Sequence, residues 1–251
     1  GLERQVACVA ASKSNGGFGA AARTRSGASL RASASYTTRH LLASTLHQAV
    51  RVTLQYEVTT HAAISQGAPM ETMKDRLRII LGDERLARLE GACVLVFGCG
   101  GVGSSCVEAL ARGGVGTLLI VDKDVVAPSN INRQAIAFES TVGQRKVDVM
   151  AAMIADISPS CRVFAHDAFV LAENLEDLYD ICLQRQMGIL TRVDAIDTVS
   201  TKLALAALAQ TRGFELISSM GGAKKIHPEC LRIADVHKTV NCSLARIMRK
   251  E

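Results

Sequence analysis

The chain has 251 residues, of which 48 % are hydrophobic and 21 % are charged, a composition typical of a globular protein with a packed core. No stretch approaches the roughly eighteen consecutive apolar residues of a membrane span, so the sequence predicts no transmembrane segment. None of the eight cysteines belongs to a Cys-x-x-Cys pair, which argues against a structural zinc site. Several lie in apolar strand or helix patterns, which suits reduced, buried thiols in a cytosol-like compartment.

The net charge of +5 comes entirely from the first part of the chain. Residues 1–69 contain seven Lys and Arg against two Glu, whereas residues 70–251 contain 22 basic and 22 acidic residues. Overall basicity is therefore no argument for nucleic-acid binding by residues 70–251, and any such binding needs a local patch.

Residues 1–69 are predicted to be a low-complexity basic extension, disordered or not part of the functional protein, ahead of one nucleotide-binding domain at 70–251. The Ala-, Ser-, Gly- and Arg-rich stretch 1–49 also resembles an organellar transit segment, which would imply a mitochondrial rather than a cytoplasmic location. Alternating apolar and polar residues from Val50 to Val58 predict one short strand within the extension.

From Met70 onward, helical and strand patterns alternate. Strands are predicted at 92–97, 117–121, 162–165, 192–196 and 216–219. Helices are predicted at 74–90 around Gly82, at 102–112, from a Thr141–Gln144 capping box to Pro159, and from 201 to 212 before Gly213. This alternation predicts an α/β fold with a doubly wound, mostly parallel Rossmann-like sheet and helices on both faces.

A glycine-rich turn joins the first of these strands to its helix. Gly98, Gly100 and Gly103 match the dinucleotide-binding fingerprint, whose glycines let backbone N–H groups approach a phosphate at a helix N-terminus. Asp122 ends the next strand, where a carboxylate can accept hydrogen bonds from ribose hydroxyls. A P-loop is excluded because no Lys-Ser/Thr follows the last glycine. The fingerprint does not separate NAD from ATP, so an NAD-dependent reductase remains an alternative here.

Polar residues downstream of the glycine loop favour a polyphosphate. Arg133 offers a planar fork suited to phosphate oxygens, and Asn130 and Asn132 flank it with neutral donors. Lys146 falls in the first turn of its helix, where the macrodipole disfavours a cation. A bound polyphosphate would supply the reason for a cation there.

A carboxylate is also expected at the edge of the sheet where the nucleotide binds. Asp197 is predicted to end the strand Val193–Asp197, and ligands of open α/β sheets bind at the carboxyl ends of strands, so Asp197 is the candidate Mg²⁺ ligand. Asp194 competes with it but lies within the strand and is expected to have a structural partner. Asp124 is a further candidate near the ribose or the metal.

The spacing of Asp122, Arg133 and Lys146 behind the glycine loop resembles the ThiF/HesA/MoeB family, relatives of the ubiquitin-activating enzymes, from about Arg76 to the end of the chain. The resemblance implies that a carboxylate attacks the α-phosphate of ATP to give an acyl-adenylate and pyrophosphate, with Arg133, Lys146, Asp197 and Mg²⁺ serving the phosphates. The full set expected to bind the nucleotide is Gly98, Gly100, Gly101, Gly103, Asp122, Asp124, Asn130, Asn132, Arg133, Lys146, Asp197 and Thr198.

The family also implies a homodimer in which an arginine enters the partner's site. Arg76 precedes Gly82 as that arginine does, and Arg78 is its rival. The segments Ile217–Gly222, Ala234-Asp235, Lys238-Thr239 and Cys242–Arg246 resemble the branch that dehydrates threonylcarbamoyladenosine at tRNA position 37. That resemblance implies a tRNA substrate whose own carbamoyl oxygen closes a ring and releases AMP.

Two other functions remain open at this stage. One is an activator of a ubiquitin-like or sulfur-carrier protein, and the other is a non-catalytic nucleotide-binding scaffold. Cys242 is a candidate for a sulfur-relay thiol or a passive loop residue, and Cys99 for a small packing residue. His227 departs from the family pattern, and the C-terminal helix is expected to run on past Glu251, so the C-terminal part is expected to be truncated. A candidate tRNA-contacting patch consists of Lys224, Lys225, Arg246, Arg249 and Lys250.

Overall fold

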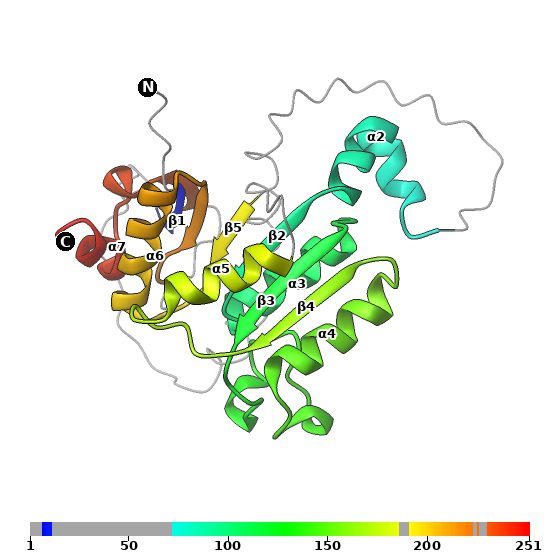
Figure 1. Ribbon diagram of the computed structural model, residues 1–251, viewed down its shortest axis with the longest axis horizontal. Coiled ribbons are helices and arrows are strands. Elements are labelled where there is room, and N and C mark those ends of the chain that lie inside the picture. The colour runs from blue at the N-terminus through cyan, green and yellow to red at the C-terminus, as the bar shows by residue number, and fades with distance from the viewer. Residues whose placement is uncertain (1–6, 12–71, 186–190, 223–224, 226–229) are drawn as a thin grey trace, which may run out of the picture.

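The computed structural model describes residues 7–11, 72–185, 191–222, 225 and 230–251. Its strands form one sheet in the order β4-β3-β2-β5-β6-β1-β7 (Figure 1). All neighbouring strands run parallel except β7, which pairs antiparallel with β1. The mostly parallel sheet predicted from the sequence is confirmed.

The strands are β1 Ala7–Ala11, β2 Cys93–Phe97, β3 Thr117–Asp122, β4 Arg162–Asp167, β5 Thr191–Asp194, β6 Leu216–Ser219 and β7 Leu231–Asp235. The α-helices are α2 Asp75–Glu90, α3 Gly101–Arg112, α4 Lys146–Ile157, α5 Leu175–Arg185, α6 Val199–Arg212 and α7 Ser243–Met248. Short 3-10 turns, η1 Pro128–Asn130, η2 Glu139–Thr141 and η4 Val236–Lys238, lie in the connections.

The central strands are apolar on both faces, and each face has its own core. Alternate β2 residues Val94 and Val96 pack with the α3 and α4 residues Val107 and Met150 on one side. Leu95 belongs to the opposite cluster, which includes residues of α5 and α6. Successive side chains of a strand point to opposite faces, so a strand covered by helices on both sides must be apolar at every position. The expected doubly wound arrangement is confirmed.

Three of the element predictions are wrong in detail. Thr141 and Gln144 do not cap α4, because Thr141 ends η2, where its Oγ1 accepts a hydrogen bond from the Phe138 amide, and Gln144 Nε2 donates to the Ser140 carbonyl. Strand β5 ends at Asp194 rather than Ile196 or Asp197, since the Asp194 carboxylate turns the chain. The last helix ends at Met248 and does not run on to Glu251.

Part of the segment 1–69 enters the sheet. Strand β1 lies between β6 and β7, with Ala7 paired to Ile217 in parallel and to Asp235 in antiparallel register. The rest of this segment, including the strand predicted at 50–58, lies outside the described residues. Its role remains a prediction.

Candidate nucleotide site

The glycine loop crosses from β2 to α3 at the carboxyl edge of the sheet, and two of its glycines are sterically required. A Cβ on Gly103 would lie 1.7 Å from the Gly98 carbonyl oxygen. Gly98 has φ 93°, and a Cβ there would lie 3.0 Å from the Ala195 carbonyl oxygen. Nothing lies within 4 Å of a Cβ on Gly100, so that glycine leaves open space above the loop. Such a loop lets backbone N–H groups face a phosphate.

Asp122 orders this loop from the end of β3. Its Oδ2 accepts a hydrogen bond of 2.6 Å from the Cys99 amide, and its Oδ1 accepts one of 2.8 Å from the Asp124 amide. A carboxylate oxygen has more than one acceptor position, so both oxygens can still accept from ribose hydroxyls. The Cys99 thiol is buried, and burial followed by the charge of Asp122 raises its pKa. It is a neutral packing group, as predicted.

Arg133 lies against the glycine loop. The ideal Cβ position of Gly101 is 3.4 Å from Arg133 Cγ, and the guanidinium Nη1 donates to the Ser129 carbonyl and to Asn132 Oδ1 at 2.9 and 3.1 Å. Asn130 is buried and its side-chain oxygen accepts a hydrogen bond from the Ala127 amide, so it shapes the turn rather than offering an exposed donor. The exposed guanidinium keeps further N–H donors for a phosphate.

Lys146 has a protein partner at the start of α4. Its side chain is only 6 % exposed, and Nζ lies 2.7 Å from Oδ2 of Asp124, whose side chain is 61 % exposed. The carboxylate therefore explains a cation in the first helical turn without invoking a phosphate. An ammonium has three donors, so two remain for a ligand at this edge.

Asp197 and Thr198 follow β5 at the same edge. Both residues are exposed, and within the described part of the chain the Asp197 carboxylate makes no hydrogen bond or ion pair. The strand ends earlier than predicted, so Asp197 lies on a loop. Asp194 is fully buried and ion-paired with Lys202, so its expected structural role is confirmed.

No group of three or more His, Cys, Asp or Glu residues that could hold a metal occurs in the described ranges. A single carboxylate is nevertheless enough for a magnesium ion held mainly by phosphates, because Mg²⁺ is usually bound by one or two carboxylates together with the phosphates. Asp197 fits that donor set.

Arg76 is not brought into this site. It lies in α2, and its neighbour Leu77 contacts the ideal Cβ position of Gly114, just before β3 begins. That is the amino edge of the sheet, whereas the glycine loop lies at the carboxyl edge (Figure 1). The rival, Arg78, pairs with Asp75 and Asp83 across the kink at Gly82.

The residues singled out near the C-terminus divide into internal and exposed groups. Cys242 is buried, and its sulfur accepts a hydrogen bond from the Ala245 amide as the cap of α7. Lys225 Nζ donates to the Asn241 carbonyl, and Arg249 donates to the carbonyls of Val236 and Thr239. Arg246 and Lys250 are exposed. Lys224 and His227 lie outside the described residues.

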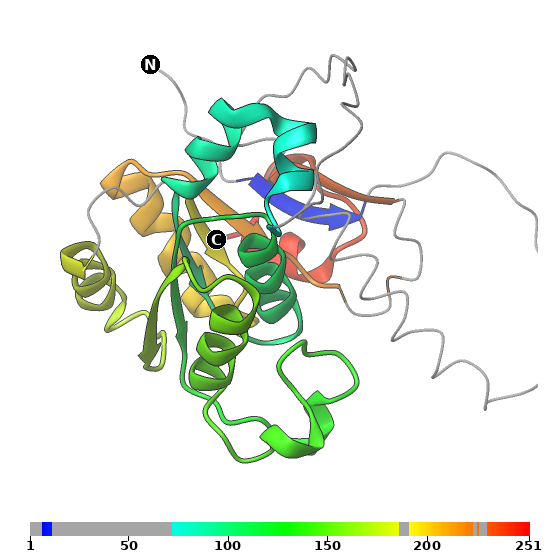
Figure 2. The ribbon, with the colours of Figure 1, turned by 90° about the vertical axis from the view of Figure 1, so that its right-hand side faces the viewer.

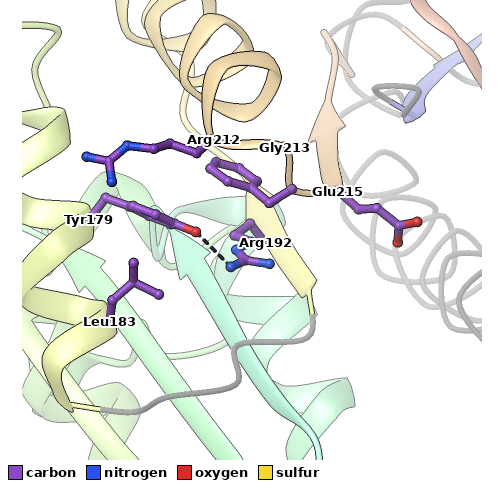
Figure 3. Close-up of a pocket in the computed structure, with 7 residues that line it drawn as sticks. Tyr179, Leu183, Arg192, Arg212, Gly213 and Glu215 are labelled. Atoms are coloured by element: carbon purple, nitrogen blue, oxygen red, sulfur yellow. Dashed lines mark hydrogen bonds between the residues drawn. The ribbon is translucent and has the colours of Figure 1, made fainter. Parts of the chain in front are cut away.

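A cleft of about 600 Å³ lies at the opposite edge of the sheet, where β5 and β6 begin (Figure 3). Arg192 lines this cleft, and its guanidinium carbon lies 4.7 Å from the ring centroid of Phe214 and 5.6 Å from that of Tyr179. Arg192 also donates to the Tyr179 hydroxyl at 2.7 Å. These contacts join α5 to the sheet, and the cleft is not part of the nucleotide site.

The partners that hold the site residues in place were not predicted from the sequence. Lys202 was not singled out, and Ser218 appeared only within the segment Ile217–Gly222, although both bind the Asp194 carboxylate. A lysine eight residues after a buried aspartate, on a helix that packs over the strand, was the available signal.

Comparison with known proteins gives one consistent result. The family model for the ThiF family matches residues 74–249 of this sequence. A tRNA threonylcarbamoyladenosine dehydratase of Bacillus subtilis is 45 % identical over 174 residues, 69 % of this chain and 66 % of that protein. The chain spans 61 % to 66 % of the lengths of the first three curated relatives.

Solved structures agree with this likeness. The crystal structure of the E. coli tRNA N6-threonylcarbamoyladenosine dehydratase TcdA superposes with a TM-score of 0.66 and 34 % identity, over 71 % of this chain and 72 % of that one. A structure of the same E. coli protein in complex with ATP gives a TM-score of 0.64 at 34 % identity, over 71 % and 74 % of the two chains.

Proposed function

The chain belongs to the ThiF family, and we propose that it is an ATP-dependent tRNA threonylcarbamoyladenosine dehydratase that works by adenylating a carboxylate. The observation that carries this proposal is the convergence of the glycine loop, Asp122, Arg133, Lys146 and Asp197 at one edge of the sheet. These residue types at one edge are suited to a ribose and a triphosphate. The B. subtilis and E. coli relatives are named tRNA threonylcarbamoyladenosine dehydratases, so the proposed acceptor is the threonyl carboxylate of that modified nucleoside in tRNA.

In the proposed reaction, a carboxylate oxygen of the substrate attacks the α-phosphorus of ATP. The bond to the bridging oxygen breaks and pyrophosphate leaves, which gives an acyl-adenylate. The neighbouring carbamoyl oxygen of the same nucleoside then attacks the activated carbonyl, closes a ring and releases AMP. No enzyme nucleophile is required, because the second nucleophile is already held in the substrate.

The chain's own residues would act on charge and position. The Arg133 guanidinium and the Lys146 ammonium would stabilise the negative charge that develops on the phosphates, and backbone amides of the glycine loop would orient them. Asp122 would hold the ribose. Asp197 would hold Mg²⁺, which when bound supplies charge neutralisation to the phosphates.

The proposal includes a homodimer. Arg76 lies at the amino edge of the sheet, whereas the nucleotide site of the same chain lies at the carboxyl edge. The same part of α2 exposes apolar side chains, with Ile79 55 % and Ile80 73 % exposed. Apolar groups gathered beside Arg76 are suited to burial against a second copy.

The proposal extends to a location and to a surface that contacts tRNA. We place the protein in the cytoplasm, and the described residues contain no helix that is long and apolar enough to cross a membrane. The exposed Arg246 and Lys250 near the C-terminus are the remaining candidates for contacts to tRNA phosphates.

The test is AMP and pyrophosphate formation from ATP, measured with tRNA carrying threonylcarbamoyladenosine and with the same tRNA unmodified. We expect turnover only with the modified tRNA, and Arg133→Ala should lower kcat by about 100-fold or more, since the guanidinium serves the transition state. Arg112→Ala, on an exposed arginine at the end of α3, is the matched control. Stimulation by a small carrier protein with a diglycine end, and not by tRNA, would overturn the proposal in favour of a carrier-activating enzyme.

A further inference from the structure

A fully buried ion pair joins three elements behind the nucleotide site. The side chains of Asp194, at the end of β5, and Lys202, on α6, are both 0 % exposed, with Nζ 2.8 Å from Oδ2. Ser218 on β6 donates to the same oxygen at 2.5 Å and lies 3.1 Å from Lys202 Nζ. These three residues are called the Asp194 network below.

Stability alone does not account for this arrangement. Two charges removed from water lose most of their hydration energy, and apolar side chains of similar volume often stabilise a core equally well or better. When the hydrogen-bonding groups of a buried ion pair are satisfied by each other and by one neighbour, the partners have few other positions available. Such a pair therefore restricts the relative positions of the elements that carry it. A network of this kind can fix the backbone segments to which its members belong.

The second carboxylate oxygen of Asp194 fixes the backbone that follows β5. Asp194 Oδ1 accepts a hydrogen bond of 3.1 Å from the Ile196 amide, which turns the chain immediately after β5. Between them, the Ala195 amide donates to the Phe97 carbonyl at 2.9 Å, and the Ala195 backbone packs against the glycine loop at Gly98. The loop after β5 is therefore fixed to the network on one side and to the glycine loop on the other.

Asp197 comes next and depends on this backbone. Its carboxylate has no hydrogen-bond or ion-pair partner among the described residues, so its position depends on the backbone that carries it. On its far side, the Lys202 amide donates to the Thr198 carbonyl at 3.1 Å. Lys202 thus contacts the loop at both ends, through its ammonium at Asp194 and through its backbone at Thr198.

We propose that Asp194, Lys202 and Ser218 are positioning residues that set Asp197 against the glycine loop without touching the nucleotide. The role given to Asp197 rests on the proposed function, whereas the fixing of the loop does not. A shift of about 1 Å in such a loop is enough to lower turnover by about 100-fold.

The variant to test is Asp194→Asn combined with Lys202→Met, which removes both charges together and leaves no unpaired buried ion. ATP affinity is measured by calorimetry with Mg²⁺ and with EDTA, using Asp197→Ala for comparison. We expect the Mg²⁺-dependent gain in ATP affinity to fall by about tenfold, as in Asp197→Ala, because displaced supporting residues typically weaken metal affinity by that order. Affinity in EDTA should stay within about twofold of the parent's, since the glycine loop is intact.

Hydrogen exchange of the nucleotide-free protein tests the fixing of the loop directly. The Ile196 amide should exchange at least about tenfold faster in the double variant, because its acceptor is no longer held, while the β2 amides remain protected. Ser218→Ala keeps the ion pair and should increase the exchange rate of the Ile196 amide by a smaller factor. This variant provides the test if the double variant does not fold.

Tyr179→Phe is the matched control, because it removes a hydrogen bond at the other end of the same strand, at Arg192 (Figure 3). It should change neither the Mg²⁺ dependence nor the exchange of the Ile196 amide. Parent-like exchange of Ile196 in a folded double variant or in Ser218→Ala would overturn the inference. A parent protein that binds no ATP, or an Asp197→Ala variant with unchanged Mg²⁺ dependence, would instead count against the proposed function.

Discussion

At the scale of single residues, the glycine loop offers two positions with opposite tolerances. A Cβ on Gly103 would overlap the Gly98 carbonyl oxygen at 1.7 Å, whereas a Cβ on Gly100 would meet nothing within 4 Å. Gly103→Ala must therefore move the backbone of the β2–α3 turn. We expect it to lower the free energy of unfolding by about 2 kcal/mol or more through strain and lost packing.

Gly100→Ala is the paired variant for that measurement. Its φ of −74° suits an ordinary residue, so its free energy of unfolding should stay within about 1 kcal/mol of the parent's. Urea unfolding of the two variants and the parent checks both expectations. Equal destabilisation by the two substitutions would show that the turn does not pack as described.

Buried thiols make a second residue-scale prediction, for the dependence of stability on pH. Burial raises the pKa of Cys93 from 9.0 to about 11 and that of Cys106 from 9.0 to about 12. Between those values the unfolded chain loses protons that the folded chain keeps, so stability is fully present below pH 9 and falls as the pH rises. Each thiol contributes a slope of about 1.4 kcal/mol per pH unit at most.

Urea unfolding at pH 8, 9 and 10 measures this slope. Cys106→Ala lacks one of the two thiols, so its stability should fall less steeply above pH 9 than that of the parent. The comparison between the two proteins cancels the lysines and tyrosines that titrate in the same range. Parallel curves for parent and variant would contradict the prediction.

At the scale of elements, α2 is two helical pieces joined at Gly82, which has φ 75° and ψ 165°. Only glycine adopts this region readily, so Gly82→Ala should cost about 1 to 3 kcal/mol or straighten the helix. Straightening would displace Asp75–Leu81, the piece that carries Arg76, and should reduce turnover. Thermal unfolding and AMP formation together measure both effects.

Gly91→Ala is the control for that substitution, because Gly91 ends the same helix with φ −79° and a Cβ there would meet only ordinary contacts. It should change the free energy of unfolding by less than about 1 kcal/mol and leave turnover unchanged. If Gly82→Ala behaves as Gly91→Ala does, the kink is not needed.

The element scale also shows why some of the structure could be predicted and some could not. Continuous apolar runs such as Val94–Phe97 identify a strand buried on both faces, because few other elements have that pattern. Helix α5 was not predicted from the sequence. The exposed apolar residues Phe169 and Leu171 in the preceding loop obscure the helical spacing of its own apolar residues. The end of β5 was misplaced because the side chain of Asp194, not a glycine or proline, turns the chain.

For the nucleotide site, the kinds of side chain that bind a nucleotide could be predicted from the sequence. The residues that form ion pairs and hydrogen bonds with them could not. The strand pattern predicted the carboxyl edge for Asp197, because parallel strands bring their carboxyl ends together, whereas Arg133 and Lys146 were predicted from their chemistry and not from their position. The sequence could not show that Asp124 pairs with Lys146, or that Lys202 and Ser218 bind Asp194, since those contacts depend on side-chain packing between distant segments.

At the scale of the whole molecule, the decisive feature is the distance between Arg76 and the nucleotide site of its own chain. Strands β2 and β3 separate the two edges of the sheet (Figure 2), and five or six residues of strand span about 17–20 Å. An arginine that acts on the phosphates from there must belong to the other subunit of a dimer. Arg76→Ala and Arg133→Ala should therefore each lower turnover by about 100-fold or more, because they remove different halves of one composite site.

Mixing these two variants tests that conclusion. In a dimer formed from one subunit of each kind, one site lacks both arginines and the other retains both. Random exchange of subunits in a two-fold dimer makes about half of the dimers mixed, so activity should recover to about one quarter of the parent's. Arg78→Ala mixed with Arg133→Ala is the matched control, since Arg78 pairs with Asp75 and Asp83 within its own chain. If turnover rises on subunit exchange only in the mixture that contains Arg76→Ala, Arg76 is the residue shared between subunits. If verified heterodimers of Arg76→Ala and Arg133→Ala are inactive, Arg76 does not act across the dimer interface.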